Sequence, residues 1–257
     1  KDYEAFREKF LKRGKAKEYI SIIEARKRKY QIDWSKSAIS KPKELGVQVL
    51  KQMSLKELVP FIDWSPFFRS WDLHGKYPDI LTDSIVGEQA THLFEDAQVM
   101  IKEIIAKQSL KPKAIFGLFE ANTIHHDDIS IQNKGKEIAV FRTLRQQLSK
   151  REGIPHIALA DFIAPKETGL TDYMGAFCVA IFGAQELAES YRQKEDDYNA
   201  IMVQAIADRF AEAFAEYLHK QIRVKHWGYV CDENLSNEDL IKESYKGIRP
   251  APGYPAC

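Results

Sequence analysis

The segment Ala114-Ile-Phe-Gly-Leu-Phe119 is followed by Asp128-Ile-Ser-Ile-Gln132, the turn Asn133-Lys-Gly135 and Glu137-Ile-Ala-Val-Phe-Arg-Thr-Leu144. Short runs rich in β-branched and aromatic residues, separated by turn residues that include glycine, are typical of neighbouring antiparallel strands. These segments therefore predict an antiparallel meander, and we expect the rest of the chain to pack around it.

Three further segments are predicted to be strands. Leu45-Gly-Val-Gln-Val-Leu50 alternates apolar and polar residues, and His156–Ile163 is a second candidate. Met174–Phe182 is nearly all apolar, which is typical of a central strand with both faces buried.

Two long helices are predicted from apolar residues at helical spacing. One runs from Thr91 until Lys111-Pro112 stops it, and the other from Tyr198 to Leu218. A short last helix is capped by Ser236-Asn-Glu-Asp239 and ended by Gly247. Because strands and helices do not alternate strictly, the pattern favours an α+β fold with a sheet flanked by helices.

A tight joint between two short helices is predicted at Ile62-Asp-Trp-Ser65. The capping box Ser54-Leu-Lys-Glu57 begins the first helix, which should end near Ile62. Pro66 is typical of the first turn of a helix, so a second helix should run from there to Trp71. The carboxylate of Asp63 is therefore expected to be held in place at a helix end.

Composition and charge exclude several classes of protein. The 257 residues include 38 basic and 37 acidic side chains, and a net charge of +1 gives no overall attraction to nucleic acid or to an anionic membrane. The longest apolar runs, such as Ala176–Ala184, fall short of the ~18 residues that a membrane span needs, and the first residues contain no signal-peptide core. Cys178, Cys231 and Cys257 form no CxxC pair. We expect a cytoplasmic protein with neither a nucleic-acid nor a membrane partner.

Several motifs of well-known enzyme classes are absent from the sequence. It contains no GxGxxG, GxxxxGK[ST], GxSxG or HExxH, which sets aside Rossmann, P-loop, α/β-hydrolase and zincin functions. The four adjacent residues His125-His126-Asp127-Asp128 are the most tempting metal ligands. Neighbours on an extended segment point to opposite faces, so at most two of the four can share a site, and a solvated hairpin entry is the favoured interpretation.

Three carboxylates around the segment 154–163 offer a second candidate site. Asp161, Glu167 and Asp172 flank this segment and its following loop, and paired carboxylates are able to act as acid and base. No nucleophile or metal ligand lies nearby in the sequence, so loop solvation is favoured over catalysis.

The segment Gly247-Ile-Arg-Pro-Ala-Pro-Gly-Tyr-Pro-Ala-Cys257 has an unusual composition. Its prolines fix an extended backbone, and Gly253 allows another group to approach closely. The backbone groups of such a strip are able to form hydrogen bonds with the edge of an adenine ring. Arg249 could contact a carboxylate at two points, and Tyr254 could supply an aromatic face. The alternative is a rigid linker whose arginine caps a neighbouring helix. Because the strip has the composition of a loop, we expect the domain to be incomplete at its C-terminal end.

Six motifs occur in one order along the chain, and together they resemble the C-terminal activation domain of cobalamin-dependent methionine synthase. They are Ile62-Asp-Trp-Ser-Pro-Phe-Phe68, Gly75-Lys-Tyr-Pro78, Ala160-Asp-Phe-Ile-Ala-Pro165, Asp172-Tyr-Met-Gly-Ala-Phe177, Ala207-Asp-Arg-Phe-Ala-Glu-Ala-Phe-Ala-Glu-Tyr-Leu-His219 and the strip 247–257. The resemblance implies a bent single domain around a twisted antiparallel sheet. We expect it to span residues 31–257, preceded by a linker or helix over residues 1–30.

The resemblance implies that this domain binds S-adenosylmethionine and donates its methyl group for reductive methylation of cob(II)alamin held on a neighbouring cobalamin-binding domain. A flavodoxin or a flavoprotein reductase would supply the electron. This step reactivates a methyltransferase that makes methionine from homocysteine and methyltetrahydrofolate. The family's zinc lies on the homocysteine domain, so this chain is expected to hold no metal and not to make methionine by itself.

Residue roles follow from the resemblance position by position. It implies that Asp63 binds the ligand's α-amino group, Arg249 its carboxylate, and Ala251 with neighbouring backbone its adenine. Gly253 is a further expected ligand-binding residue. Tyr254 would lie near the cobalamin and is the expected catalytic residue. Two other readings stay open: a non-catalytic S-adenosylmethionine-binding module that docks an electron-donor flavoprotein, and a metal hydrolase built on His125 and Asp127.

Overall fold

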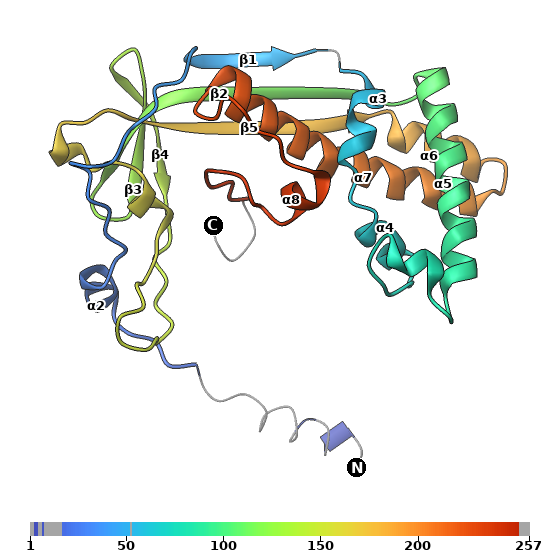
Figure 1. Cartoon of the computed structure of the whole chain (residues 1–257), viewed down its shortest axis with the longest axis horizontal. Helices are drawn as coiled ribbons and strands as arrows, with labels where there is room; N and C mark the ends of the chain where they lie inside the picture. The colour runs from blue at the N-terminus through green and yellow to red at the C-terminus, as the bar shows by residue number, and fades with distance from the viewer. Residues whose placement is uncertain (1–2, 5–6, 8–16, 52, 252–257) are drawn as a thin grey trace. The chain divides into compact units, whose positions relative to one another are not determined.

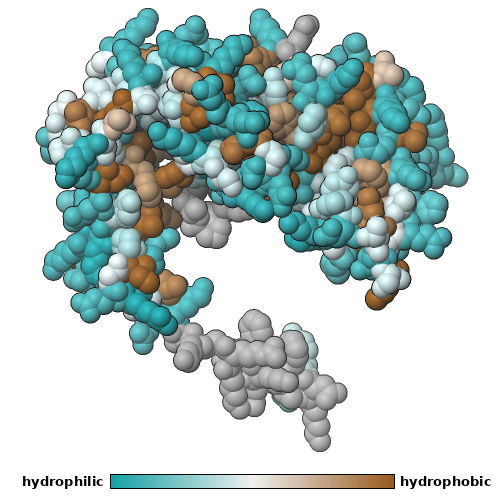
Figure 2. Space-filling view, viewed as in Figure 1, coloured by the Kyte–Doolittle hydropathy of each residue, from teal (hydrophilic) through white to brown (hydrophobic). Residues whose placement is uncertain are grey.

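The computed structural model describes residues 3–4, 7, 17–51 and 53–251 (Figure 1). The chain divides into two compact units, and each is taken by itself below. The first comprises residues 1–41, 119–174 and 248–257, and the second comprises residues 42–118 and 175–247. Hydrophilic side chains cover much of the face shown in Figure 2, with apolar side chains scattered among them.

The described strands form an open, five-stranded antiparallel sheet in the order β1-β2-β3-β4, with β5 also paired to β2. They are β1 (Gly46–Leu50), β2 (Lys111–Ile124), β3 (Asp128–Asn133), β4 (Lys136–Arg142) and β5 (Asp172–Phe182). In register, Val49 lies opposite Ile115, Thr123 opposite Ile129, and Ser130 opposite Val140. The predicted meander and the α+β class are confirmed.

The second unit holds most of the helices. They are α3 (Leu55–Leu58), η1 (Val59–Phe61), α4 (Ser65–Ser70), η2 (Asp79–Thr82), α5 (Gly87–Lys107), α6 (Ala184–Arg192), α7 (Asp197–Gln221), the π-helical turn η5 (Ile222–His226) and α8 (Asn237–Ile241). The long helix α7 turns its apolar stripe inward because residues three and four apart share one face. Phe210 and Phe214 on that stripe are completely buried, together with Phe67 and Phe68 of α4. This apolar core fixes α4, and with it the chain that precedes α4.

The first unit has a smaller apolar core and a buried ionic one. It contains α2 (Ile22–Lys27) and the 3-10 helices η3 (Leu159–Phe162) and η4 (Lys166–Thr168), beside β3, β4 and the end of β2. Residues near α2 are tied to the segment 149–156, because Ser149 N–H donates to the Glu18 carbonyl and His156 N–H to the Arg28 carbonyl, both at 2.8 Å. Residues 18–28 are therefore packed structure. The domain boundary expected at residue 30 stays a prediction.

Two of the predicted strands differ from the structure. The segment 156–163 is not a strand: it contains η3, where the Asp161 carboxylate turns back to accept a hydrogen bond from Ala158 N–H at 3.0 Å. Met174–Phe182 does lie in a strand, β5, but its predicted central, doubly buried position is wrong. Among the described strands β5 pairs only with β2, and Gly175, Ala176 and Cys178 are exposed.

The predicted helices are found with altered ends. The short helix α8 ends at Ile241 rather than at Gly247, since the left-handed backbone at Glu243 (φ 54°) stops it earlier. Ser54 precedes α3 as predicted, yet its side chain makes no capping hydrogen bond. Helix α5 begins at Gly87, one turn before Thr91.

Candidate functional site

The predicted joint around Asp63 lies between η1 and α4. The half-buried Asp63 carboxylate accepts a hydrogen bond through Oδ1 from Ser65 N–H at 3.0 Å, which closes an Asx turn at the start of α4. Ser65 Oγ in turn accepts from Tyr77 N–H at 3.1 Å. No described residue donates to the second carboxylate oxygen, Oδ2. The carboxylate is thus held in one orientation with an acceptor left over.

Aromatic packing and a helix from farther along the chain fix this joint. The buried Trp64 ring meets Phe67 and Phe94 edge to face, with ring centroids 5.3 and 4.8 Å apart. The Ile62 carbonyl accepts a hydrogen bond at 3.2 Å from the side-chain amide of Asn237, the first residue of α8. Helix α8 is therefore tied directly to the residue before Asp63.

The strip that follows α8 turns sharply at Gly247. Gly247 has φ 112°, a conformation that favours glycine, and a Cβ placed there would lie 2.6 Å from Tyr229 Oη. The Tyr229 hydroxyl donates to the Lys246 carbonyl at 3.1 Å, and burial raises its pKa to about 12. The turn thus requires a residue without a side chain at position 247 and is held by the Tyr229 hydroxyl beside it.

The remaining predicted ligand-binding residues follow this turn. Arg249 is half-buried and Ala251 is exposed, whereas Gly253 and Tyr254 lie outside the described residues. Asp63 and Arg249 belong to different units, so each is described in its own surroundings. Their convergence on one ligand stays a prediction.

A buried ionic cluster at the end of α7 was not predicted from the sequence. The Arg223 and Glu233 side chains are 0% and 2% exposed and form a two-point ion pair, with nitrogen–oxygen distances of 2.7 and 2.6 Å. Arg223 Nη1 lies 2.7 Å from His219 Nδ1, and the guanidinium carbon lies 4.2 Å from the centre of the Tyr245 ring. The spacing of His219 and Arg223 by four residues on one helix face was the available signal.

The carboxylates proposed as an acid–base group instead have separate structural surroundings. Asp161 forms a two-point ion pair with the fully buried Arg145, at 2.6 and 2.8 Å. Asp172 accepts hydrogen bonds from Ala164 and Tyr173 N–H, and burial raises its pKa. Glu167 is exposed. The predicted loop solvation is therefore wrong for Asp161, which is buried in an ion pair, and of the three carboxylates Glu167 is the exposed one.

The candidate metal ligands are also drawn apart. Asp127 is buried and accepts from Arg145 Nε and Arg26 Nε, both at 2.7 Å. His125 and His126 are exposed, with left-handed backbones at φ 49° and 72° in the turn between β2 and β3. Within the described part of the chain, no three His, Cys, Asp or Glu side chains are grouped as metal ligands would be.

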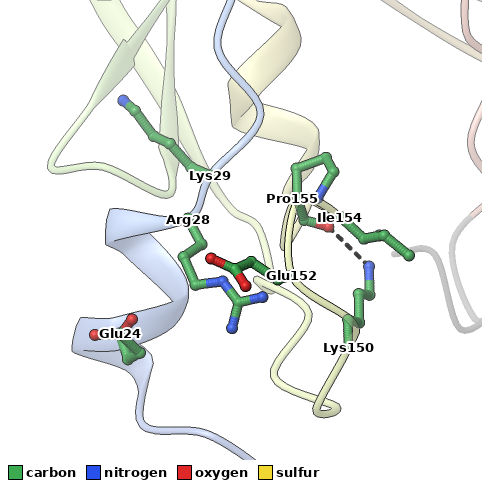
Figure 3. Close-up of a pocket in the computed structure, with 8 residues that line it drawn as sticks. Glu24, Arg28, Lys29, Lys150, Glu152, Ile154 and Pro155 are labelled. Carbon is green, nitrogen blue, oxygen red and sulfur yellow. Dashed lines mark hydrogen bonds between the residues drawn. The ribbon is translucent and has the colours of Figure 1, made fainter.

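An open hollow of about 710 Å³ lies in the first unit (Figure 3). Residues in and just after α2 and residues of the segment 150–155 line it, among them the oppositely charged Glu24, Arg28, Lys150 and Glu152. The Lys150 ammonium is engaged there, donating to the Pro155 carbonyl at 2.9 Å. None of the predicted ligand-binding residues lines this hollow.

A sequence model described as "Vitamin B12 dependent methionine synthase, activation domain" matches residues 54–257 of this chain. The chain belongs to this family of activation domains. A solved structure described as the MetH reactivation domain bound to AdoHcy is 47% identical in sequence, with a TM-score of 0.89. The match covers 93% of this chain and 74% of that one.

The family assignment confirms the resemblance given by the six motifs. All the residues to which that resemblance gave a role, from Asp63 to Tyr254, fall inside the matched range of this activation domain. No helix in the described residues is both long and apolar enough to cross a membrane.

Proposed function

We propose that this activation domain binds S-adenosylmethionine and donates its methyl group in the reductive methylation of cobalamin, which reactivates methionine synthase. The observation that carries the proposal is the likeness, at 47% identity over 93% of the chain, to a reactivation domain solved with S-adenosylhomocysteine (AdoHcy) bound. AdoHcy is what remains of S-adenosylmethionine once the methyl group has left.

The chemistry of the predicted residues fits such a ligand. Its amino-acid end carries one ammonium and one carboxylate, and the chain offers the Asp63 carboxylate for the first and the Arg249 guanidinium for the second. Asp63 Oδ1 is oriented by Ser65, and Oδ2 has no donor among the described residues, which suits a hydrogen bond from an ammonium. A planar guanidinium is able to meet a carboxylate at two points, as an ammonium is not.

The remaining ligand contacts come from the strip after Gly247. In the proposal, Ala251 and Gly253 present backbone groups to the adenine, and Tyr254 lies at the mouth of the site. When bound, S-adenosylmethionine supplies a sulfonium methyl group that reduced cobalt takes up by in-line attack. This chain's residues bind and orient the donor, and an aromatic side chain at the mouth would keep water from the reacting atoms.

The proposal implies partners that carry the other reactants. The cobalamin would be held by the cobalamin-binding domain of the same enzyme, and the electron that reduces cob(II)alamin would come from a flavodoxin or a flavoprotein reductase. Zinc belongs to the homocysteine domain in this scheme, and methionine formation requires that domain too. A cytoplasmic location is part of the same proposal.

Mixing the components tests the methyl-transfer role. The full natural chain, a separately made cobalamin-binding domain, S-adenosylmethionine carrying a labelled methyl group and a chemical reductant should together give labelled methylcobalamin, with its characteristic absorbance. Omitting S-adenosylmethionine is the control for label and spectrum. Binding of S-adenosylmethionine without any transfer would favour the alternative, a module that only binds the ligand and docks an electron-donor flavoprotein.

A further inference from the structure

The buried guanidinium of Arg223 contacts both ends of the segment that leads to the ligand-binding strip. Glu233, before α8, forms the two-point ion pair with it, and the ring of Tyr245, after α8, has its centre 4.2 Å from the guanidinium carbon. Eleven residues lie between these two contacts, and only five of them are helical. One side chain thereby joins the two ends of a loop that has little regular structure of its own.

The protonation of the cluster follows from its geometry. Arginine has only donors, so His219 Nδ1, 2.7 Å from Arg223 Nη1, must be an unprotonated acceptor. The His219 ring also packs edge to face on Tyr245, with centroids 4.8 Å apart. The single positive charge of Arg223 is matched by the single negative charge of Glu233, as burial of both requires.

The chain just beyond Tyr245 has a further anchor. The Tyr229 hydroxyl donates to the Lys246 carbonyl, and the tight turn at Gly247 abuts the same hydroxyl. Arg249 follows Gly247 by only two residues. The chain just before Arg249, from Tyr245 to Gly247, is therefore held by contacts that converge on Arg223 and Tyr229.

We infer that Arg223 is a positioning residue for recognition of the ligand's carboxylate: it holds the Tyr245–Gly247 segment, from which the chain leads directly to Arg249. The inference rests on the proposed function. Arg223 itself need not touch the ligand, and its effect passes through the chain between Tyr245 and Arg249.

Arg223→Lys is the informative variant. Lysine keeps the charge opposite Glu233 but loses the two-point contact and the guanidinium that lies over the Tyr245 ring. Tyr245→Leu is the second variant, because it leaves both members of the Arg223–Glu233 ion pair in place and removes the Tyr245 ring that packs on Arg223 and His219. The matched control is Arg145→Lys, which makes the same change at a buried arginine that forms a two-point ion pair with Asp161 in the other unit.

Calorimetric binding of two ligands to the full natural chain separates positioning from general destabilisation. The ligands are AdoHcy and S-adenosyl-3-thiopropylamine, which lacks only the carboxylate. Arg223→Lys and Tyr245→Leu should each weaken AdoHcy about tenfold or more, corresponding to ~1.4 kcal/mol, and change the affinity of the second ligand much less. Arg145→Lys should show no such selectivity.

This experiment distinguishes failure of the proposed function from failure of the inference about Arg223. A parent chain that binds neither ligand would overturn the proposed function, and this inference with it. The inference alone would be overturned if the parent binds AdoHcy and Arg223→Lys weakens both ligands by the same factor. It would also be overturned if the variant weakens neither ligand. If Arg223→Lys does not fold, Tyr245→Leu decides by the same comparison.

Discussion

The Asp63 carboxylate accepts a hydrogen bond from the backbone N–H of Ser65 at 3.0 Å, through one of its two oxygens. That bond orients the side chain at the start of α4 and does not use Oδ2. A group fixed in this way has two separable roles, one in closing the turn and one in offering a negative charge. An asparagine keeps the first role and loses the second, since its carbonyl oxygen is still able to accept from Ser65.

Asp63→Asn is therefore expected to leave the fold intact and to weaken AdoHcy. Loss of a charge-assisted hydrogen bond to the ligand's ammonium costs about 1.5–3 kcal/mol. An AdoHcy analogue without the amino group should lose much less affinity, because it never makes that contact. Calorimetry with the two ligands measures the difference, and equal losses with a lower melting temperature would mean that Asp63 only closes the turn.

Asp83→Asn is the matched control for Asp63→Asn. Asp83 Oδ1 accepts from Ile85 and Val86 N–H at 2.8 and 3.0 Å ahead of α5, and these backbone bonds lower its pKa. The variant thus makes the same chemical change at a second turn-closing carboxylate. It should alter the affinity of neither ligand.

Arg249→Lys is expected to weaken AdoHcy although the charge is kept. An ammonium cannot make the planar two-point contact with a carboxylate, and one lost charge-assisted bond costs about 1.5–3 kcal/mol. The analogue that lacks the carboxylate should bind parent and variant alike. Unchanged AdoHcy affinity in the variant would exclude Arg249 as the carboxylate ligand.

Arg145→Ala tests the buried ionic core of the first unit. The variant leaves the buried carboxylates of Asp127 and Asp161 without their guanidinium, and breaking a buried ion pair in this way costs about 3–5 kcal/mol. Denaturant unfolding measures the loss. Lys107→Ala removes a partner from the exposed Lys107–Glu103 pair and should leave the unfolding midpoint nearly unchanged. Similar losses of unfolding free energy in the two variants would show that burial of an ion pair does not determine its contribution to stability.

Local sequence patterns predicted the parts of the fold that depend on neighbouring residues. The β-branched and aromatic residues of β3 and β4, the turn residues between them and the helical spacing in α7 are local signals, and the two strands and the helix were found as predicted. The segment 156–163 failed because a long-range contact outweighs its strand preference. Asp161 is drawn into η3 by its ion pair with Arg145, sixteen residues away.

In the candidate site too, the residues set by local signals were predicted and those set by long-range contacts were not. Asp63 was placed correctly in a joint between two helices because Pro66, in the first turn of α4, is a local signal. The Arg223 cluster was missed, since Glu233 and Tyr245 reach it through a loop whose course no periodicity reveals. The predicted contacts between Arg249 and a ligand need a convergence of distant segments, which a single sequence does not encode locally.

Tyr254→Ala tests the predicted catalytic residue, which lies outside the described part of the chain. Tyr254 follows Arg249 by five residues in a proline-rich strip, so it should stand at a set distance from the carboxylate end of the ligand. The variant should bind AdoHcy nearly as well as the parent and slow reductive methylation in the intact enzyme. If Tyr254 instead belongs to the adenine pocket, removing its ring should weaken AdoHcy binding by roughly 0.5–1.5 kcal/mol beyond the loss of buried apolar area.

Tyr229→Phe is expected to change how stability depends on pH at the alkaline end. Burial raises the pKa of the Tyr229 hydroxyl from 10.0 to about 12 in the folded chain. Between these values the folded chain keeps a proton that the unfolded chain has lost, so the free energy of unfolding falls as pH rises from 10 toward 12. Phenylalanine has no proton to lose, and the variant's denaturant midpoint should fall less steeply over this range.

Tyr198→Phe is the matched comparison for Tyr229→Phe. Burial also raises the pKa of Tyr198 to about 12, and its hydroxyl donates to Asp96 at 2.6 Å on an exposed face. Both variants should therefore flatten the alkaline fall in stability, Tyr198→Phe by less because its side chain is 43% exposed and screened by solvent. Only Tyr229→Phe should also weaken AdoHcy at neutral pH, because only that hydroxyl holds the Lys246 carbonyl beside the turn at Gly247. Equal AdoHcy affinity in the two variants would mean that this hydrogen bond does not position the strip.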